Sequence, residues 1–324
     1  MAADFDQLTP RYFLPDLEKA LSAEMTGFAS ALSSYVNRVY EMETVSGDRV
    51  IVKFYRLGRW SEDAILDEHD FLWDCDAEDI PVAAPYELFH GSTLGFSQGI
   101  PFAVFPKLHG RQAEFEGLES FRRAGILLGH IHACGARRRA EYRMEMTPES
   151  FAFRAMERLF ESGAVSVNQE EALKCVCVDL LALAGKVFEE GFDFLRIHGD
   201  FHRGNILLNT QNELSVMDFD DMVNGPAVQD FWLLLPGYVD ECTGELEALL
   251  EGYEMFRSFD RREIRLIEPL RAMRMMHFLS WCAVQKEDRR FREWNPDWGT
   301  EEFWRKEVQS LSEQLERMKK VLCF

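Results

Sequence analysis

The fold of this chain is decided by His198-Gly199-Asp200-Phe201-His202-Arg203-Gly204-Asn205-Ile206-Leu207-Leu208 and by the segment that follows it, Val216-Met217-Asp218-Phe219-Asp220-Asp221. Apolar runs flank a polar turn here, which predicts a pair of short strands, residues 206–209 and 214–217. An acid and an amide, Asp200 and Asn205, come just before the first strand, and a second acid, Asp218, ends the second strand. We therefore expect these polar side chains to lie at one end of the strand pair.

The spacing of these polar residues is typical of phosphoryl transfer. Protein kinases carry the pattern H-R-D-x-x-x-x-N and then D-F-G. His198, Asp200 and Asn205 keep both spacings, and Asp218-Phe219-Asp220 stands in the place of D-F-G. Transfer to a hydroxyl needs a carboxylate that accepts or orients the proton, and oxygen ligands that hold Mg²⁺ against the phosphates. A polar turn whose carboxylates cap local amides would explain Asp200 alone, but not the whole set.

Two lobes are predicted around this stretch. Ahead of it, strand-like runs separated by turn residues indicate a small antiparallel sheet, and a helical pattern precedes them at residues 10–26. The expected strands are residues 28–32, 38–43, 49–55 and 102–105. After Gly110 the pattern becomes helical, at residues 118–133, 170–190 and most of 228–322. We therefore expect an α+β, protein-kinase-like fold with an N-terminal nucleotide-binding lobe, residues 1–108, and a larger, mainly helical catalytic and substrate lobe, residues 109–324.

A kinase needs a lysine on the third strand of its small lobe. Val50-Ile51-Val52-Lys53-Phe54-Tyr55 supplies Lys53, which we expect to contact the α- and β-phosphates of ATP. Outside this context Lys53 would be interpreted as a lysine on an edge strand. The next helix begins at Ser61, and it offers Glu68 as the ion-pair partner of Lys53, with Asp67 as the second choice. Both acids could instead be ordinary exposed helix residues.

The loop between the first two strands should cover the phosphates, although it has no glycine-rich pattern. It reads Ser33-Ser34-Tyr35-Val36-Asn37-Arg38. Small hydroxyl residues can present backbone N–H groups and a side-chain donor to a phosphate. We expect Ser34 to contact ATP, and the alternative is a plain hairpin turn.

Composition restricts the partners and the compartment. The formal net charge of the 324 residues is −20, which disfavours nucleic acid and anionic membranes as partners. The short basic cluster Arg137-Arg138-Arg139 is interpreted as a solvated helix end rather than a phosphate-binding surface. Seven scattered cysteines without a C-x-x-C motif indicate reduced thiols, and the acidic N-terminus, residues 1–6, does not resemble a signal peptide. We expect a soluble cytoplasmic protein without a membrane span.

These motifs resemble those of the aminoglycoside phosphotransferase and choline kinase superfamily, which uses H-G-D-x-H-x-x-N and a D-F-D or D-x-D pair. More closely, the chain resembles the bacterial stress response kinase A family of serine/threonine kinases, nearly from end to end. The segments that carry this resemblance are Ser34-Tyr35-Val36-Asn37-Arg38-Val39-Tyr40, Val52-Lys53-Phe54-Tyr55-Arg56 and residues 81–85, 102–106, 224–230 and 267–274.

The resemblance implies a monomeric cytoplasmic kinase that phosphorylates serine and threonine during envelope or oxidative stress. It implies that Asp200 is the proton acceptor and Asp218 a second catalytic carboxylate. Asn205 and Asp218 would bind Mg²⁺, and Ser34 would touch ATP. Phe201 and Arg203 are bulky and basic at positions where such loops often carry small or polar residues, which affects the expected fit of the substrate.

Two other functions remain open. A small-molecule kinase acting on an amino alcohol, a sugar or an aminoglycoside would share every catalytic residue. Only eleven residues separate Asp218 from Asp230, so the long activation loop that forms a peptide platform in eukaryotic-type kinases has no room. A pseudokinase that binds nucleotide and acts as a scaffold is the third possibility, and the intact set of polar residues argues against it.

Five further residues have alternative roles. His202 could brace the catalytic loop or bind a phosphate, and Asp220 could help with a second metal or cap a turn. Asp230 could accept hydrogen bonds from the catalytic-loop backbone. Arg271 and Arg274 lie one helical turn apart and could dock an acidic substrate or form inter-helix salt bridges.

Overall fold

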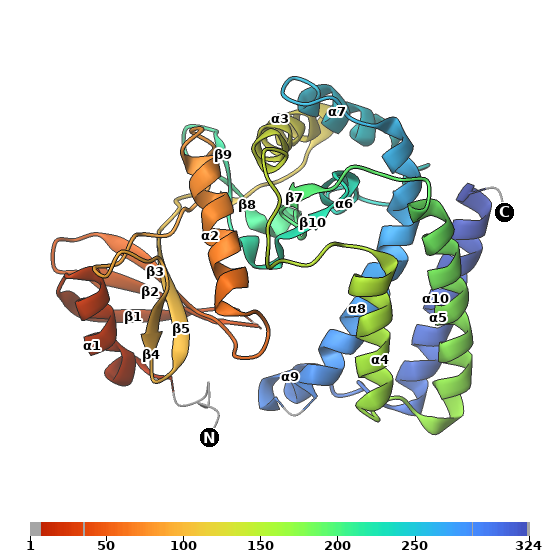
Figure 1. Ribbon diagram of the computed structural model, residues 1–324, viewed down its shortest axis with the longest axis horizontal. Coiled ribbons are helices and arrows are strands. Elements are labelled where there is room, and N and C mark those ends of the chain that lie inside the picture. The colour runs from red at the N-terminus through yellow and green to blue at the C-terminus, as the bar shows by residue number, and fades with distance from the viewer. Residues whose placement is uncertain (1–7, 35, 287, 323–324) are drawn as a thin grey trace. The chain divides into compact units, whose positions relative to one another are not determined.

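The protein is described by a computed structural model that covers residues 8–34, 36–286 and 288–322 (Figure 1). The acidic N-terminus, Tyr35 of the predicted phosphate loop and Cys323 lie outside the described residues. The chain divides into two compact units. Unit 1 consists of Met1–Arg143, His198–Met222 and Thr243–Ser258, and unit 2 of Met144–Ile197, Val223–Cys242 and Phe259–Phe324.

Unit 1 contains a five-stranded antiparallel sheet in the order β1-β2-β3-β5-β4 (Figure 1). Its strands are β1 (Met25–Leu32), β2 (Arg38–Thr44), β3 (Arg49–Phe54), β4 (Gly95–Ser97) and β5 (Ile100–Pro106). Lys53 on β3 lies opposite Val39 of β2 and Ala103 of β5. Because β3 has a neighbour on both sides, the interpretation of Lys53 as an edge-strand lysine is wrong.

The first helix ends earlier than the apolar pattern predicts. The structure has α1 at Pro10–Leu21, because Ser22 adopts a left-handed φ of 51° and ends the helix. The strand β1 then starts at Met25, three residues before the predicted position. Phe13 of α1 packs on the sheet, with its ring centroid 4.7 Å from that of Phe54, and this contact closes the apolar core of the small sheet.

Three further helices belong to unit 1. They are α2 (Glu62–Asp76), α3 (Gly117–Gly135) and α7 (Thr243–Tyr253). The Ser61 hydroxyl accepts a hydrogen bond from the Ala64 N–H at 3.1 Å, which is the capping interaction that the sequence predicts for the start of α2. Helices α3 and α7 pack so closely that a Cβ at Gly125 would lie 2.0 Å from the Leu249 carbonyl oxygen.

A second, three-stranded sheet in unit 1 carries the predicted polar motifs at its strand ends. It has the order β6-β8-β9, formed by β6 (Arg111–Gln112), β8 (Ile206–Leu208) and β9 (Leu214–Val216). Ile206 pairs with Val216 in antiparallel register. Short 3₁₀ turns, η3 (Arg203–Asn205) and η4 (Phe219–Asp221), flank this strand pair. The predicted pair of strands is therefore confirmed, each strand one residue shorter than expected.

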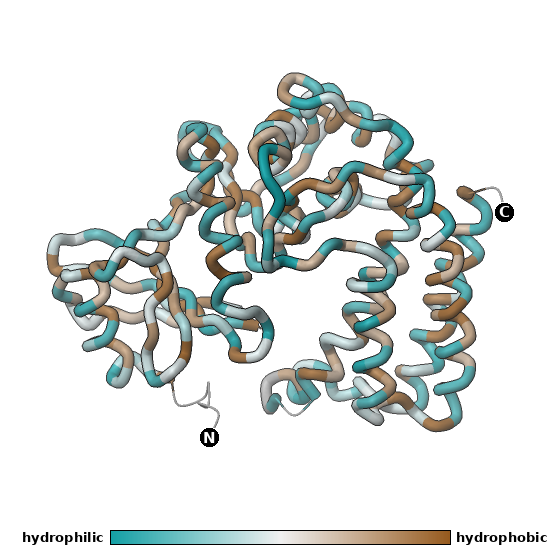
Figure 2. Tube along the Cα trace, in the orientation of Figure 1, coloured by the Kyte–Doolittle hydropathy of each residue, from teal (hydrophilic) through white to brown (hydrophobic). Residues whose placement is uncertain are grey.

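Unit 2 is mainly helical. It contains η2 (Pro148–Phe153), α4 (Arg154–Glu161), α5 (Val167–Phe188), α6 (Val228–Trp232), η5 (Arg261–Leu266), α8 (Ile267–Gln285), α9 (Arg289–Trp294) and α10 (Glu301–Leu322). A short antiparallel pair, β7 (Leu195–Ile197) and β10 (Val223–Gly225), lies among them. Figure 2 shows apolar and polar residues in turn along α5 and α10, the pattern of helices that bury one face. No helix in the described ranges combines the length and apolarity that crossing a bilayer requires.

These elements confirm the predicted α+β class, with a small antiparallel sheet near the N-terminus and a mainly helical remainder. Asp230 is fully buried on α6 in unit 2, and its predicted bond to the catalytic loop stays a prediction. Arg271 of α8 pairs within its own helix, with Nε 3.3 Å from Glu268 Oε2, so the expected inter-helix salt bridges stay a prediction.

Candidate active site

His198 ties the catalytic loop to the end of β9. Its ring is fully buried, and its Nδ1 accepts a hydrogen bond from the Asp200 N–H at 3.2 Å. Because Nδ1 is an acceptor, the proton of the neutral imidazole lies on Nε2, which is 3.0 Å from the Met217 carbonyl oxygen. One buried side chain therefore ties Met217, the residue before Asp218, to the backbone of Asp200.

Gly199 allows the loop to approach the turn after β9. Its φ is 82°, and a Cβ at this position would lie 2.1 Å from the Asp221 carbonyl oxygen. Any other residue would strain the backbone and collide with the turn. The loop that carries Asp200 and the turn that starts at Asp218 are thus held together by backbone contact.

Asp200 is braced by His202. The His202 Nδ1 accepts a hydrogen bond from the Gly204 N–H at 2.9 Å, so in the neutral ring Nε2 carries the proton. That Nε2 lies 3.3 Å from Asp200 Oδ2. Of the two roles open to His202, the structure shows the bracing contact. This contact holds the Asp200 carboxylate through its Oδ2 oxygen.

Asn205 and Asp218 offer hard oxygen ligands. The Asn205 amide nitrogen donates to the Asp200 carbonyl oxygen at 3.0 Å, so its amide oxygen is the atom that can serve a cation. Asp218 has a φ of 63°, an uncommon conformation for an aspartate, and its side chain is 57% exposed. A strained residue that presents a carboxylate to solvent is typical of a functional position.

This pair fits the way proteins bind Mg²⁺ with a nucleotide. Among the residues that the structure describes, no group of three or more His, Cys, Asp or Glu side chains is arranged to hold a metal ion. Mg²⁺ at phosphate sites takes only one or two protein carboxylates and fills its other positions with phosphate oxygens and water. One carboxylate and one amide oxygen are therefore a sufficient set of protein ligands.

Lys53 is buried among three carboxylates. Its Nζ lies 3.1 Å from Asp220 Oδ1, 3.2 Å from Glu68 Oε1 and 3.4 Å from Asp218 Oδ1. Burial alone would lower the pKa of Lys53, but the charges of Asp220 and Glu68 raise it well above its usual value. Lys53 is therefore a fixed cation beside the carboxylate that we assign to the metal.

The structure places Glu68, and not Asp67, against Lys53. Asp67 instead accepts hydrogen bonds through Oδ2 from the backbone N–H groups of Tyr142, at 2.6 Å, and Arg143, at 3.1 Å. The two acids are neighbours on α2 and point to different faces of the helix. Glu68 is 1% exposed, so the alternative that it is an ordinary exposed helix acid is wrong.

Asp220 is held by two cations. Besides Lys53, Arg59 reaches it, with Nη1 2.9 Å from Asp220 Oδ2, and Arg59 also pairs with Asp221. Burial would raise the pKa of Asp220, but the charges of Lys53, Arg59 and Arg143 hold it below the ordinary value. Sequence reasoning missed Arg59 and Arg143, because neither belongs to a motif and their partners are distant in the sequence.

Ser34 lies in the loop between β1 and β2 and is partly buried. Asn37 anchors this loop, since its side-chain oxygen accepts a hydrogen bond from the Arg56 N–H at 3.2 Å. The Arg56 side chain in turn donates from Nε to the Val36 carbonyl oxygen at 2.8 Å. The loop is thus attached to the end of β3, and the contact of Ser34 with ATP stays a prediction.

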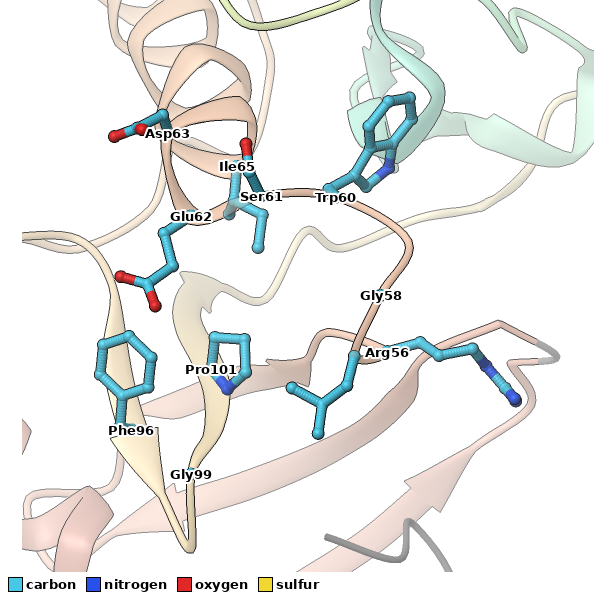
Figure 3. A pocket seen from close by; sticks show the side chains of 11 residues that line it. Arg56, Gly58, Trp60, Ser61, Glu62, Asp63, Ile65, Phe96, Gly99 and Pro101 are labelled. Atoms are coloured by element: carbon cyan, nitrogen blue, oxygen red, sulfur yellow. The ribbon is translucent and has the colours of Figure 1, made fainter. Parts of the chain in front are cut away.

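A pocket of about 470 Å³ opens elsewhere in unit 1 (Figure 3). It lies between the loop after β3, the start of α2 and the hairpin of β4 and β5. Glu62, Phe96 and Pro101 face one another across it, with Trp60 at one side. None of the predicted catalytic or metal-binding side chains lines this pocket.

Comparison with known proteins gives close relatives. Residues 29–267 match the phosphotransferase enzyme family. Stress response kinase A of Escherichia coli strain K12 is 39% identical over 285 residues, which cover 87% of this chain and 85% of that protein. The serine/threonine protein kinase RdoA of Salmonella typhimurium strain LT2 is 37% identical over 284 residues, with the same shares covered.

Solved structures of more distant proteins share the fold. Amicoumacin kinase hAmiN, in complex with AMP-PNP, Ca²⁺ and Ami, superposes with a TM-score of 0.71 at 18% identity, over 97% of this chain and 94% of that one. A microcompartment-associated aminopropanol kinase gives 0.69 at 18% identity, over 96% of both chains. Choline kinase LicA from Streptococcus pneumoniae gives 0.62 at 16% identity, over 91% and 94%. These likenesses confirm the kinase-like fold.

Proposed function

The chain belongs to the phosphotransferase enzyme family and is a kinase, and we propose that it transfers the γ-phosphoryl group of Mg²⁺-ATP to serine or threonine hydroxyls of proteins during envelope or oxidative stress. The observation that carries the choice of a protein acceptor is the 37% identity, over 87% of this chain, to a protein named as a serine/threonine kinase. The ion pairs of Lys53 with Glu68 and Asp218 support the phosphotransfer chemistry.

In the proposed mechanism Asp200 orients the acceptor hydroxyl and takes its proton. The acceptor oxygen attacks the γ-phosphorus in line with the bond to the β-phosphate oxygen, which breaks and releases ADP. His202 holds Oδ2 of Asp200 and so keeps the carboxylate in one orientation. A carboxylate whose other oxygen is already bonded loses little freedom when the acceptor arrives.

Asn205 and Asp218 would hold Mg²⁺, and Asp218 would be the second catalytic carboxylate. The bound ion supplies positive charge that neutralises the β- and γ-phosphates as the bond breaks. Lys53 and Ser34 would position the phosphates. Because Glu68 and Asp220 hold Lys53, its ammonium is already in place when the nucleotide binds.

Three further proposals follow from the family and the composition. We place a lobe boundary near residue 108, and we propose a cytoplasmic monomer. With a net charge of −20, the chain is expected to bind neither nucleic acid nor anionic membranes.

The second candidate is a kinase for a small hydroxyl compound. It is favoured by the solved structures that share the fold, because these proteins are named as amicoumacin, aminopropanol and choline kinases. Only eleven residues separate Asp218 from Asp230, which leaves no room for the peptide platform of eukaryotic-type kinases. Both candidates use the same catalytic residues.

Transfer of radiolabelled γ-phosphate from Mg²⁺-ATP separates the candidates. The acceptors are a generic basic protein and a panel of amino alcohols and sugars, and Asp200→Asn is the control. Label on protein that is lost in Asp200→Asn supports the protein kinase. Label only on a small molecule supports the second candidate. ATP binding without transfer to any acceptor would favour a nucleotide-binding scaffold.

A further inference from the structure

The segment after α3 runs along α2 within unit 1 (Figure 1). We call residues 137–143 the strap. Arg137 Nη1 lies 2.6 Å from Glu78 Oε1, and Arg138 Nη2 lies 2.8 Å from Asp74 Oδ2. A second nitrogen of Arg138 lies 3.2 Å from Asp70 Oδ2. Arg138 thus pairs with two acids one turn apart on α2, and Arg137 pairs with Glu78 just after the helix ends.

The strap continues to the next turn of α2 through its backbone. Asp67 Oδ2 accepts the N–H groups of Tyr142 and Arg143. Because this carboxylate binds two successive N–H groups, it fixes the direction in which the chain enters the interior at Arg143. The Asp67 contact, next to Arg143 in the chain, therefore helps to orient the buried side chain of Arg143.

Arg143 reaches two elements of the active site at once. Its Nη2 lies 2.9 Å from Glu68 Oε2, on the carboxylate oxygen opposite to the one that Lys53 contacts. Its Nη1 donates to the carbonyl oxygens of Asp220, at 2.6 Å, and Met222, at 3.2 Å. The side chain of Arg143 is 0% exposed.

Two further contacts attach Arg143 to the start of α2. Its Nε donates to the Ala64 carbonyl oxygen at 2.6 Å, and its guanidinium lies 4.1 Å from the centroid of the Trp60 ring. Only the planar, five-donor guanidinium can bind a carboxylate and three carbonyl groups in these directions. Lysine has the same charge but lacks the planar set of N–H donors.

We propose that Arg143 is a positioning residue for phosphoryl transfer: it clamps Glu68 and the turn from Asp218 to Met222 together, so that Lys53 and Asp218 keep their places without nucleotide. The proposal rests on the proposed kinase function. Glu68 is held by Lys53 on one oxygen and by Arg143 on the other. The α2 helix can therefore leave β3 only if the Lys53 pair breaks, and it can leave the turn after β9 only if Arg143 gives up the carbonyl groups of Asp220 and Met222 or its own contacts with α2. The contacts of Arg143 therefore favour the paired arrangement of Lys53, Glu68 and Asp218.

The test compares variants at the buried end of the strap with variants at its surface. Arg143→Lys keeps the positive charge but loses the planar set of N–H donors. Arg138→Gln removes a surface contact of the same strap. We expect Arg143→Lys to lower kcat by roughly 10²-fold, the effect of a 1 Å misplacement, with a KM for ATP within a few-fold of wild type. Arg138→Gln should stay within about twofold of wild type, because exposed ion pairs contribute little.

A double-mutant cycle shows whether Arg143 acts through Glu68. In a Glu68→Gln background, Arg143→Lys should cost much less than it costs in the wild-type protein, since the pair it supports is already broken. Equal effects in the two backgrounds would overturn the proposal, and so would a wild-type kcat in a folded Arg143→Lys protein.

Two measures keep the test decisive if Arg143→Lys does not fold or if no acceptor is phosphorylated. Asp67→Asn weakens the backbone anchor of Arg143 while its guanidinium remains, and it should accelerate amide hydrogen exchange in α2 and at residues 219–222 together. Asp70→Asn, on the same helix face, is the matched control and should leave residues 219–222 unchanged. If Asp67→Asn loosens neither segment, the clamp is wrong. If exchange responds but the wild-type protein transfers no phosphate, the proposed function fails instead.

Discussion

Lys53 on β3 and Glu68 on α2 form a buried ion pair, with 3.2 Å between Nζ and Oε1. The residues are 15 positions apart, and their side chains are 8% and 1% exposed. A buried pair of this kind costs desolvation, which only close contacts and further hydrogen bonds can offset. Asp220 and Arg143 supply those further contacts, so the pair belongs to a network of alternating charges.

Lys53→Met should therefore destabilise the protein as well as stop phosphotransfer. It leaves Glu68 and Asp220 buried with one cation fewer each, and the expected loss is about 3–5 kcal/mol in the free energy of unfolding by urea. Lys107→Met is the matched control, because Lys107 pairs with Glu41 at 2.8 Å but is 32% exposed. That control should cost about 1 kcal/mol or less. Equal losses of unfolding free energy in the two variants would show that burial does not increase the contribution of the Lys53 ion pairs to stability.

Asp218→Ala should weaken binding of Mg²⁺-ATP more than binding of ATP in the presence of a chelator. The reason is that the substitution removes one of the two oxygen groups assigned to the metal. Titration calorimetry with and without Mg²⁺ measures both affinities. A variant that binds Mg²⁺-ATP as tightly as the wild-type protein would remove Asp218 from the metal site.

Much of the fold follows from local patterns in the sequence. The Ser61 cap sets the start of α2, and the apolar runs of β3, β5, β8 and β9 lie within a residue or two of the predicted strands. The end of α1 could not be predicted in the same way, because the apolar spacing continues past Leu21 while the left-handed Ser22 stops the helix. Short strands such as β6 and β10 have two and three residues, too few to show a period.

The residues of the candidate site also differ in whether the sequence alone can predict them. Spacing alone marks Asp200, Asn205 and Asp218, because they belong to one continuous stretch. Arg143 could not be found that way, since its partner Glu68 is 75 positions away in the sequence. Its role depends on how the chain returns to α2 after α3, which is a tertiary fact.

His69 should make the protein less stable in mild acid. It is buried between the Tyr55 hydroxyl, at 2.9 Å, and the Thr93 hydroxyl, at 2.6 Å. Burial, with the charges of Lys53 and Arg143, lowers the pKa of His69 from 6.5 to about 3. Between these values the unfolded chain binds a proton that the folded chain does not, so this stability is complete above pH 6.5 and is lost as the pH falls toward 3.

The size of this effect can be measured against His69→Gln, which has no proton to gain. Between pH 7.5 and pH 5.0 the wild-type protein should lose about 2 kcal/mol more free energy of unfolding than the variant. Urea denaturation at the two pH values gives both numbers. Parallel losses would show that His69 is protonated in the folded state at pH 5.0.

Asp200→Asn should keep nucleotide binding and lower turnover by about 10²–10⁴-fold, the range for a positioned general base. The amide cannot take the proton of the acceptor, but it keeps the shape of the side chain. Single-turnover kinetics with saturating Mg²⁺-ATP measure the chemical step directly. Turnover near the wild-type rate would exclude Asp200 as the base.

His202→Ala should show whether the brace on Asp200 matters for that step. Without the Nε2–H donor that now lies 3.3 Å from Oδ2, the Asp200 carboxylate can turn away from the acceptor. We expect kcat to fall by roughly 10- to 100-fold with the affinity for ATP unchanged, because a misdirected base affects the transition state and not nucleotide binding. His202→Gln retains an N–H donor and should recover part of the loss.

The combination with Asp200→Asn separates a brace from an independent contact to phosphate. If His202 acts only through Asp200, the double variant His202→Ala/Asp200→Asn should be as slow as Asp200→Asn and no slower. If His202 instead binds a phosphate, the two losses should multiply and the KM for ATP should rise in His202→Ala alone. The contact between Nε2 and Oδ2 predicts the first result, since the donor that a phosphate would need is already directed at the carboxylate.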